Sequence, residues 1–113
     1  MRTLYTIHAV DTDKLAGVID QMRTLGAPSI RVVDCGDYLM ALEGTHRIAA
    51  AAELGMAPEL IVLDQDDLVE ADSLDWQDLR AGQKYTAGEL AGEAFSPSAG
   101  SYHIDANGTL EAI

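Results

Sequence analysis

The chain has 113 residues, 48% of them hydrophobic, which is enough for one packed domain. Its single cysteine, Cys35, excludes an intramolecular disulfide, and no stretch is apolar enough for a secretion signal or a membrane span, so we expect a cytoplasmic protein. The net charge of −12 repels nucleic acid phosphates over most of the surface, so we expect no direct nucleic acid partner.

The first part of the chain predicts a strand, a helix and a hairpin. Residues 2–10 alternate loosely and predict a strand. The helix, over residues 12–25, is predicted by capping oxygens from Asp11 onward, by Gly26 at its end, and by apolar residues at helical spacing: Leu15, Val18, Ile19, Met22 and Leu25. Two short apolar runs at 30–33 and 38–42 predict the hairpin.

A second helix and another strand follow. Residues 48–54 are rich in alanine and predict a helix that Gly55 ends. Residues 60–63 form a continuous apolar run, which predicts a buried central strand rather than an edge strand. The resulting β-α-β-β-α-β order predicts an α+β fold.

The pattern weakens after residue 63, where residues 64–113 carry 2 basic and 11 acidic residues, a net charge of −9. We expect short helices here, one over 74–79 anchored by Trp76 and one starting at Thr86, which has capping-box spacing to Glu89. Residues 96–101 predict a loop, and residues 102–113 predict a terminal hairpin.

The stretch Glu43-Gly44-Thr45-His46-Arg47 carries the functional prediction. It joins a predicted strand to a predicted helix through a glycine, and it places a hydroxyl and two nitrogen-rich side chains at the helix start. The free N–H groups and the dipole of a helix start attract phosphate. The alternative is an ordinary helix start, in which His46 and Arg47 pair with acidic neighbours such as Glu43 or Glu53.

In this context, Gly44-Thr45-His46-Arg47 resembles the phosphate-binding signature of the ParB/sulfiredoxin superfamily. The likeness covers about residues 3–64 and includes the run Gly26, Pro28, Ile30 and Val32. It implies a small mixed sheet packed by two main helices, with residues 65–113 as an acidic extension of the same domain. It also implies a ParB-like nucleotide-binding domain that takes ATP, ADP or CTP with Mg²⁺.

The resemblance assigns a role to each residue of the turn. Gly44 would let the backbone approach the phosphates, and Thr45 would donate its hydroxyl and N–H at the helix cap. His46 and Arg47 would donate to phosphate oxygens. Glu43 would orient Arg47, hold a ligand hydroxyl or support a metal.

Departures from the family pattern narrow the chemistry. Sulfiredoxin has its reactive cysteine where this chain has Thr45, and Cys35 does not replace it, so we do not expect sulfinic acid repair. The chain also lacks the arginine-rich box and helix-turn-helix of chromosome-partition ParB proteins. The superfamily's free serine kinases leave open an NTPase or phosphotransferase, with Asp11, Asp13 or Glu43 as the general base.

Other residues have a simpler interpretation. We interpret His8 as a packed or surface residue rather than as part of the pocket. Asp64, Asp66 and Asp67 lack the glycine and distal glutamate of an EF-hand, so we interpret them as a solvated loop. The alternative function is a non-catalytic interaction module, whose acidic second half binds a protein partner; the sequence leaves a homodimer open.

Overall fold

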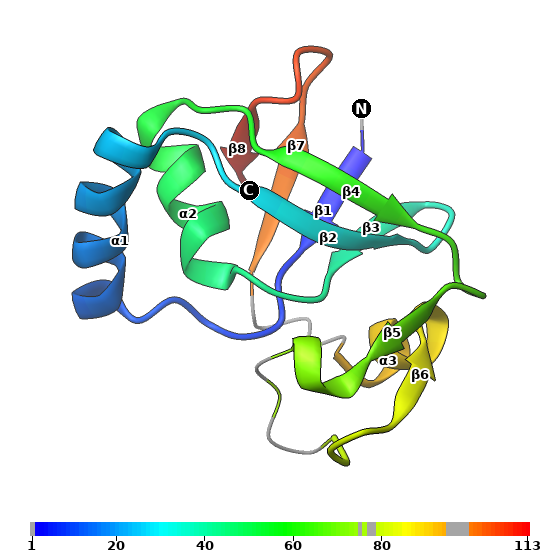
Figure 1. Cartoon of the computed structure of the whole chain (residues 1–113). Helices are drawn as coiled ribbons and strands as arrows, with labels where there is room; N and C mark the ends of the chain where they lie inside the picture. The colour runs from blue at the N-terminus through cyan, green and yellow to red at the C-terminus, as the bar shows by residue number, and fades with distance from the viewer. Residues whose placement is uncertain (1, 75, 77–78, 95–99) are drawn as a thin grey trace.

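A six-stranded mixed sheet forms the centre of the fold, in the order β4-β2-β3-β1-β7-β8 (Figure 1). The structure, a computed structural model, describes residues 2–74, 76, 79–94 and 100–113. β1 pairs with β3 and β2 with β4 in parallel, and the other neighbours are antiparallel. The strands are β1 (Arg2–Tyr5), β2 (Ser29–Asp34), β3 (Tyr38–Ala41), β4 (Glu59–Leu63), β7 (Ser101–Ile104) and β8 (Leu110–Ala112).

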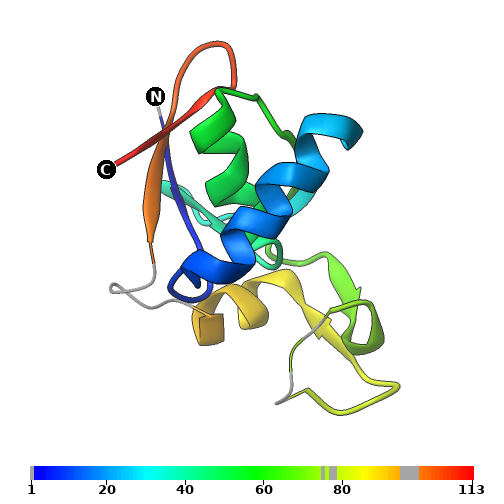
Figure 2. The ribbon, with the colours of Figure 1, turned by 90° about the vertical axis from the view of Figure 1, so that its left-hand side faces the viewer.

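Two helices cover one face of this sheet. α1 (Thr12–Leu25) and α2 (Thr45–Leu54) pack against each other, as Figure 2 shows. The Asp11 side chain caps α1, and Gly26 ends it with an N–H bond to the Met22 carbonyl. The predicted bounds of α1 are therefore confirmed, as are the β-α-β-β-α-β order and the stop of α2 at Gly55.

The sheet separates two hydrophobic cores, because successive side chains of a strand point to opposite faces. In β2, Val32 packs with residues of α1 and α2, whereas Val33 packs with the residues that cover the other face of the sheet. In β3, Leu39 and Met40 divide in the same way. Both faces are therefore covered, and the chain is an α+β protein with three layers.

The second face carries a small unit that the sequence predicted only in part. β5 (Leu68–Glu70) and β6 (Lys84–Thr86) form a hairpin, with a 3₁₀ turn at Ala71–Ser73 and helix α3 (Ala87–Ala94). In Figure 2 these elements lie together below α1 and α2. The predicted capping box is confirmed, because the Thr86 hydroxyl accepts from the Glu89 N–H and the Glu89 carboxylate accepts from the Thr86 N–H.

Several predicted elements differ from the structure. The first strand ends at Tyr5 rather than Val10. The 60–63 run was expected at the centre of the sheet, but β4 is an edge strand, and Ile61 and Val62 are 43% and 51% exposed. The sequence predicts no strands at β5 and β6, because three-residue strands show no usable alternation.

The remaining predictions fall partly outside the described residues. Of the helix expected over 74–79, residues 75 and 77–78 lie outside them, and Leu74 is extended. Most of the loop expected over 96–101 also lies outside them. The terminal hairpin is confirmed as β7 and β8, and it extends the central sheet by pairing with β1. None of the described helices has the length and hydropathy to cross a membrane.

Candidate functional site

All five residues of the Glu43–Arg47 stretch line one open pocket of about 1300 Å³. One wall comes from the α1–α2 side of the molecule and the other from the unit that contains α3. Besides the Glu43–Arg47 stretch, the pocket is lined by Ile7, His8, Lys14, Leu42, Ser73, Trp76, Leu79, Tyr85, Glu89, Leu90 and Glu93. The structure therefore places the predicted phosphate turn in a cavity of ligand size.

Gly44 forms the turn that starts α2. Its backbone is left-handed, with φ 74° and ψ 32°, a conformation that favours glycine. A Cβ atom at this position would lie 2.6 Å from Cδ1 of the fully buried Ile30. The turn therefore requires glycine both for its backbone conformation and for its fit against β2.

The N-terminus of α2 differs from those of the other two described helices. α1 is capped by the Asp11 carboxylate and has Asp13 in its first turn. α3 begins with the capping box of Thr86 and Glu89. α2 has no side-chain cap and no acidic residue in its first turn, and its first helical bond runs from the Ile48 N–H to the Gly44 carbonyl.

The bare start of α2 leaves three backbone donors at the pocket. The N–H groups of Thr45, His46 and Arg47 precede the first helical hydrogen bond and have no intrahelical acceptor. Together with the helix dipole, they favour an anion at this end of the pocket.

Thr45 is the first residue of α2 rather than its cap, which corrects the sequence prediction. Its side chain is almost completely buried, and its hydroxyl has no hydrogen-bond partner among the described residues. A buried hydroxyl without a partner costs about 1–3 kcal/mol. Such a group at a pocket wall is what a bound ligand or water would satisfy.

His46 is held by the start of α1. Its Nε2 accepts a hydrogen bond of 3.0 Å from the Asp11 N–H, so in this arrangement the ring is neutral and Nδ1 carries the proton. Burial lowers the pKa of His46, and the neighbouring His8 and Lys14 side chains lower it further against an opposing contribution from Asp11. At pH 7 His46 is therefore a neutral donor through Nδ1.

His8 lies beside His46, which corrects its interpretation as a residue outside the site. The two ring centroids are 5.5 Å apart, and both rings line the pocket. His8 is placed by the loop after β1, and its Nδ1 lies 2.9 Å from the Ala9 carbonyl. The early end of β1 gives the loop its course toward α2, and no local sequence pattern indicated this contact.

Two cationic side chains line the same end of the pocket. Arg47 and Lys14 are exposed, and neither forms a side-chain hydrogen bond or salt bridge with any residue that the structure describes. The Arg47 guanidinium folds back over the turn, with Nε and Nη2 each 3.4 Å from where a Gly44 Cβ would lie. Both charges are therefore available to a ligand.

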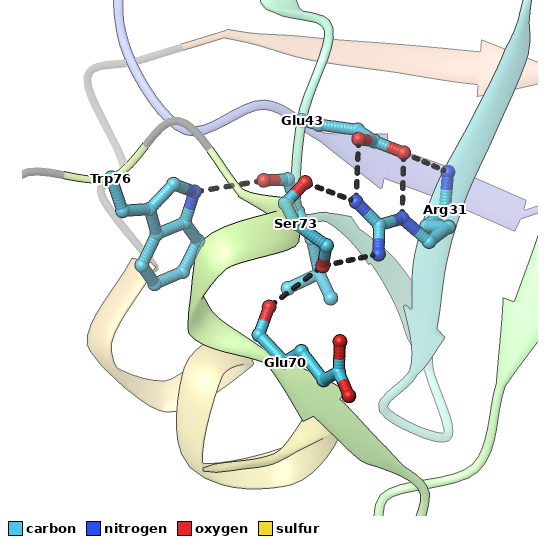
Figure 3. A network of polar contacts seen from close by, with 6 residues as sticks. Arg31, Glu43, Glu70, Ser73 and Trp76 are labelled. Carbon is cyan, nitrogen blue, oxygen red and sulfur yellow. Dashed lines mark hydrogen bonds and ion pairs between the residues drawn. The ribbon is translucent and has the colours of Figure 1, made fainter. Parts of the chain in front are cut away.

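Glu43 does not orient Arg47; it pairs with Arg31 of β2 (Figure 3). Nε and Nη2 of Arg31 donate to the two carboxylate oxygens at 2.9 Å each, and the Arg31 backbone N–H adds a third bond of 3.1 Å. The hydrogen bond with Arg31 lowers the pKa of Glu43 and raises that of Arg31. A carboxylate with three donors is a weak general base.

Arg31 was not predicted as a site residue, and it also connects the two walls of the pocket. Its guanidinium donates to the Ser73 hydroxyl at 3.0 Å and to the Ser73 carbonyl at 2.9 Å (Figure 3). Trp76 adds a second link, because its Nε1 donates to the Leu42 carbonyl at 2.9 Å. Both links hold the unit on the second face to the residues just before Gly44.

The second wall combines aromatic and acidic side chains. Trp76 and Tyr85 line this wall, together with Glu89 and Glu93 of α3. Glu89 is engaged in the capping box, whereas the Glu93 carboxylate makes no hydrogen bond with the residues that the structure describes. The pocket is therefore rich in donors at α2 and acidic at α3.

The other predicted acidic groups lie outside the pocket lining. Asp11 caps α1, and Asp13 is exposed in its first turn. Asp67 accepts a hydrogen bond from the Asp64 N–H, as in an ordinary turn. Across the described ranges, no group of three or more His, Cys, Asp or Glu side chains is arranged to hold a metal ion.

Comparisons of the chain with models of protein families, with curated proteins and with solved structures found no match. The ParB/sulfiredoxin resemblance therefore stays a prediction from the sequence. What the pocket can do chemically rests on its own geometry.

Proposed function

We propose that this protein binds a nucleotide or another phosphate-bearing small molecule, with the phosphate at the N-terminus of α2. The observation that carries the proposal is the bare start of this helix. Its first three N–H groups have no intrahelical acceptor and belong to residues that line the pocket, together with the cations Lys14 and Arg47, which are unpaired among the described residues. The starts of α1 and α3 both carry carboxylates instead.

The chemistry of the turn fits a phosphate group. Arg47 is suited to a bidentate contact with phosphate oxygens, and Lys14 supplies a point charge. The neutral His46 donates through Nδ1 only, since Nε2 is occupied by the Asp11 N–H. The Thr45 hydroxyl has no partner among the described residues and would gain one from a ligand or its water.

The rest of the pocket fits a larger ligand than phosphate alone. Its volume exceeds what one phosphate requires, and the Trp76 and Tyr85 rings offer faces for a base or another planar group. Mg²⁺ would enter bound to the phosphates, because it usually keeps several waters and needs only one or two protein carboxylates. Among the lining carboxylates we assign Glu93 as the ligand of this Mg²⁺, since Glu43 and Glu89 already accept hydrogen bonds within the protein.

Phosphotransfer or NTPase activity is the second proposal, and the same residues set its limits. A general base needs a carboxylate that can take up a proton, which the ion-paired Glu43 does poorly. We therefore assign Glu43 a positioning role, in which it ties the Gly44 turn to β2. If the ligand is turned over, Glu93 is the carboxylate to test first.

Calorimetric titration with ATP, ADP and CTP, with and without Mg²⁺, tests the proposal. We expect at least one nucleotide to bind, and Arg47→Ala to weaken its affinity about ten- to a hundredfold, the loss of one charge-assisted contact. Arg80→Ala is the matched control, since Arg80 is exposed and outside the pocket. If no nucleotide binds the wild type, the nucleotide proposal fails, and phosphate release in the same samples tests turnover.

A further inference from the structure

The edge strand β4 has a sequence that does not match its surroundings. Leu60-Ile61-Val62-Leu63 is continuous in apolar residues, a pattern typical of strands with a neighbour on each side and both faces covered. In the structure β4 has one neighbour, β2. Edge strands in soluble proteins are usually protected by an internal charge, a proline or a bulge, and β4 has no such residue among Leu60–Leu63.

The side of β4 away from β2 offers backbone groups that have no partner in the part of the chain that the structure describes. The Glu59 N–H donates to the Pro28 carbonyl, so Glu59 faces β2, and Ile61 and Leu63 face it by alternation. Leu60 and Val62 then point their N–H and C=O groups away from the sheet. Such a row of donors and acceptors can pair with one more strand.

The side chains of β4 favour a strand with apolar residues. Ile61 and Val62 are about half exposed, one on each face of the sheet, and Leu68 at the start of β5 is 66% exposed. A strand added at this edge would cover both β4 side chains with its own alternating side chains.

The ends of β4 are acidic. Glu59 stands at its start, and Asp64, Asp66 and Asp67 follow its end. Among the described residues none of these four carboxylates forms a salt bridge. If β4 paired with β4 of a second copy in antiparallel orientation, the acidic ends of the two strands would meet and repel each other. Two chains with a net charge of −12 each also repel each other as a whole, so a second copy is disfavoured at this edge.

We infer that β4 is a docking edge for an extended, basic segment of a partner protein, which pairs with Leu60 and Val62 and places Lys or Arg beside the acidic ends. Backbone pairing supplies the contact, and the charges select the partner. This surface lies outside the residues that line the phosphate pocket, so the inference does not depend on the proposed function.

Amide NMR titration with the peptide acetyl-KRVTVTVRK-amide tests this inference. We expect saturable shifts of the Leu60 and Val62 amide signals. The peptide acetyl-KRVPVPVRK-amide has the same charge but cannot pair through its prolines, and acetyl-EDVTVTVDE-amide has the opposite charge. We expect each of these two peptides to bind at least about tenfold more weakly than the basic peptide. The proline peptide lacks backbone N–H donors for strand pairing, and the acidic peptide lacks charge complementarity to the ends of β4.

Two variants locate the contact. Val62→Lys puts a positive charge on the docking edge and should weaken the basic peptide by about tenfold or more. Leu25→Lys makes a comparable change at an exposed leucine of α1, where it should leave binding unchanged. Circular dichroism of both variants checks that they fold.

Three results would overturn the inference. The first is the absence of shifts at Leu60 and Val62 with the basic peptide, and the second is equal binding of the proline peptide, which would show charge attraction without strand pairing. The third is a concentration-dependent shift of the same amides without any peptide, which would assign the edge to a second copy of the chain.

Discussion

The Arg31 guanidinium of β2 donates two hydrogen bonds of 2.9 Å to the carboxylate of Glu43, the residue just before the glycine that starts α2. Both side chains are 24% exposed, so each charge is largely removed from water. The same guanidinium reaches Ser73 on the opposite wall. This ion pair therefore fixes the position of the proposed phosphate turn relative to both walls of its pocket.

Loss of the ion pair should destabilise the fold. Arg31→Met leaves the Glu43 carboxylate largely buried without its cation, which should lower the free energy of unfolding by about 2 kcal/mol in urea titrations. The control is Arg23→Met, whose exposed pair with Asp20 at 3.7 Å should contribute less than about 0.5 kcal/mol. Equal effects of the two substitutions would refute this role for Arg31.

The same pair sets a pH dependence. Because Arg31 lowers the pKa of Glu43 in the folded state, the pair stabilises the fold fully above the ordinary glutamate pKa. This stabilisation is lost as the pH falls through the lowered, folded-state pKa. Unfolding titrations of the wild type and Arg31→Met should therefore converge at acidic pH, and a constant difference down to the lowest pH would contradict the assignment.

Gly44 should be more sensitive to substitution than another left-handed glycine. Gly44→Ala meets the backbone strain of φ 74° and also a contact of 2.6 Å with Ile30, whereas Gly55→Ala meets only the strain of φ 66°. We expect about 1 kcal/mol of destabilisation at Gly55 and about 1–3 kcal/mol more at Gly44. Thermal unfolding of both variants measures the difference, and a smaller loss at Gly44 would contradict the packing described here.

His46 should make the fold less stable in mild acid. Its pKa is lowered in the folded state, chiefly by burial, so the unfolded chain binds a proton more readily. The stability it contributes is complete above the ordinary imidazole pKa of about 6.5 and is lost as the pH falls from there through the folded-state pKa. His46→Gln keeps an acceptor for the Asp11 N–H and should flatten this part of the stability profile.

The measurement compares the slopes of the two stability profiles between neutral and mildly acidic pH. If His46→Gln keeps the slope of the wild type, the hydrogen bond from the Asp11 N–H does not hold His46 in its neutral form.

Elements with strong local signals could be predicted from the sequence. α1 has a capping aspartate, helical spacing and a terminal glycine, and α3 has the capping box, so their starts follow from neighbouring residues alone. The position of β4 in the sheet could not be predicted in this way, because an apolar run shows that a strand favours burial but not how many neighbours it has.

The candidate site likewise has a part that could be predicted from the sequence and a part that could not. The five residues of the turn are consecutive, so their placement at one helix start followed from the local pattern. Arg31 meets Glu43 only through the arrangement of the strands, and His8 meets His46 only through the course of a loop. These contacts depend on tertiary structure. The sequence therefore left Arg47, a ligand hydroxyl and a metal open as partners of Glu43 and did not indicate Arg31, its partner in the structure.

Amide NMR titration with pyrophosphate tests the central claim most directly, because it reports on each backbone donor of the turn. We expect the Thr45, His46 and Arg47 amide signals to shift together and saturate, with larger changes than the amide signals at the capped starts of α1 and α3. The absence of shifts at these three amides, or equal shifts at all three helix starts, would contradict it.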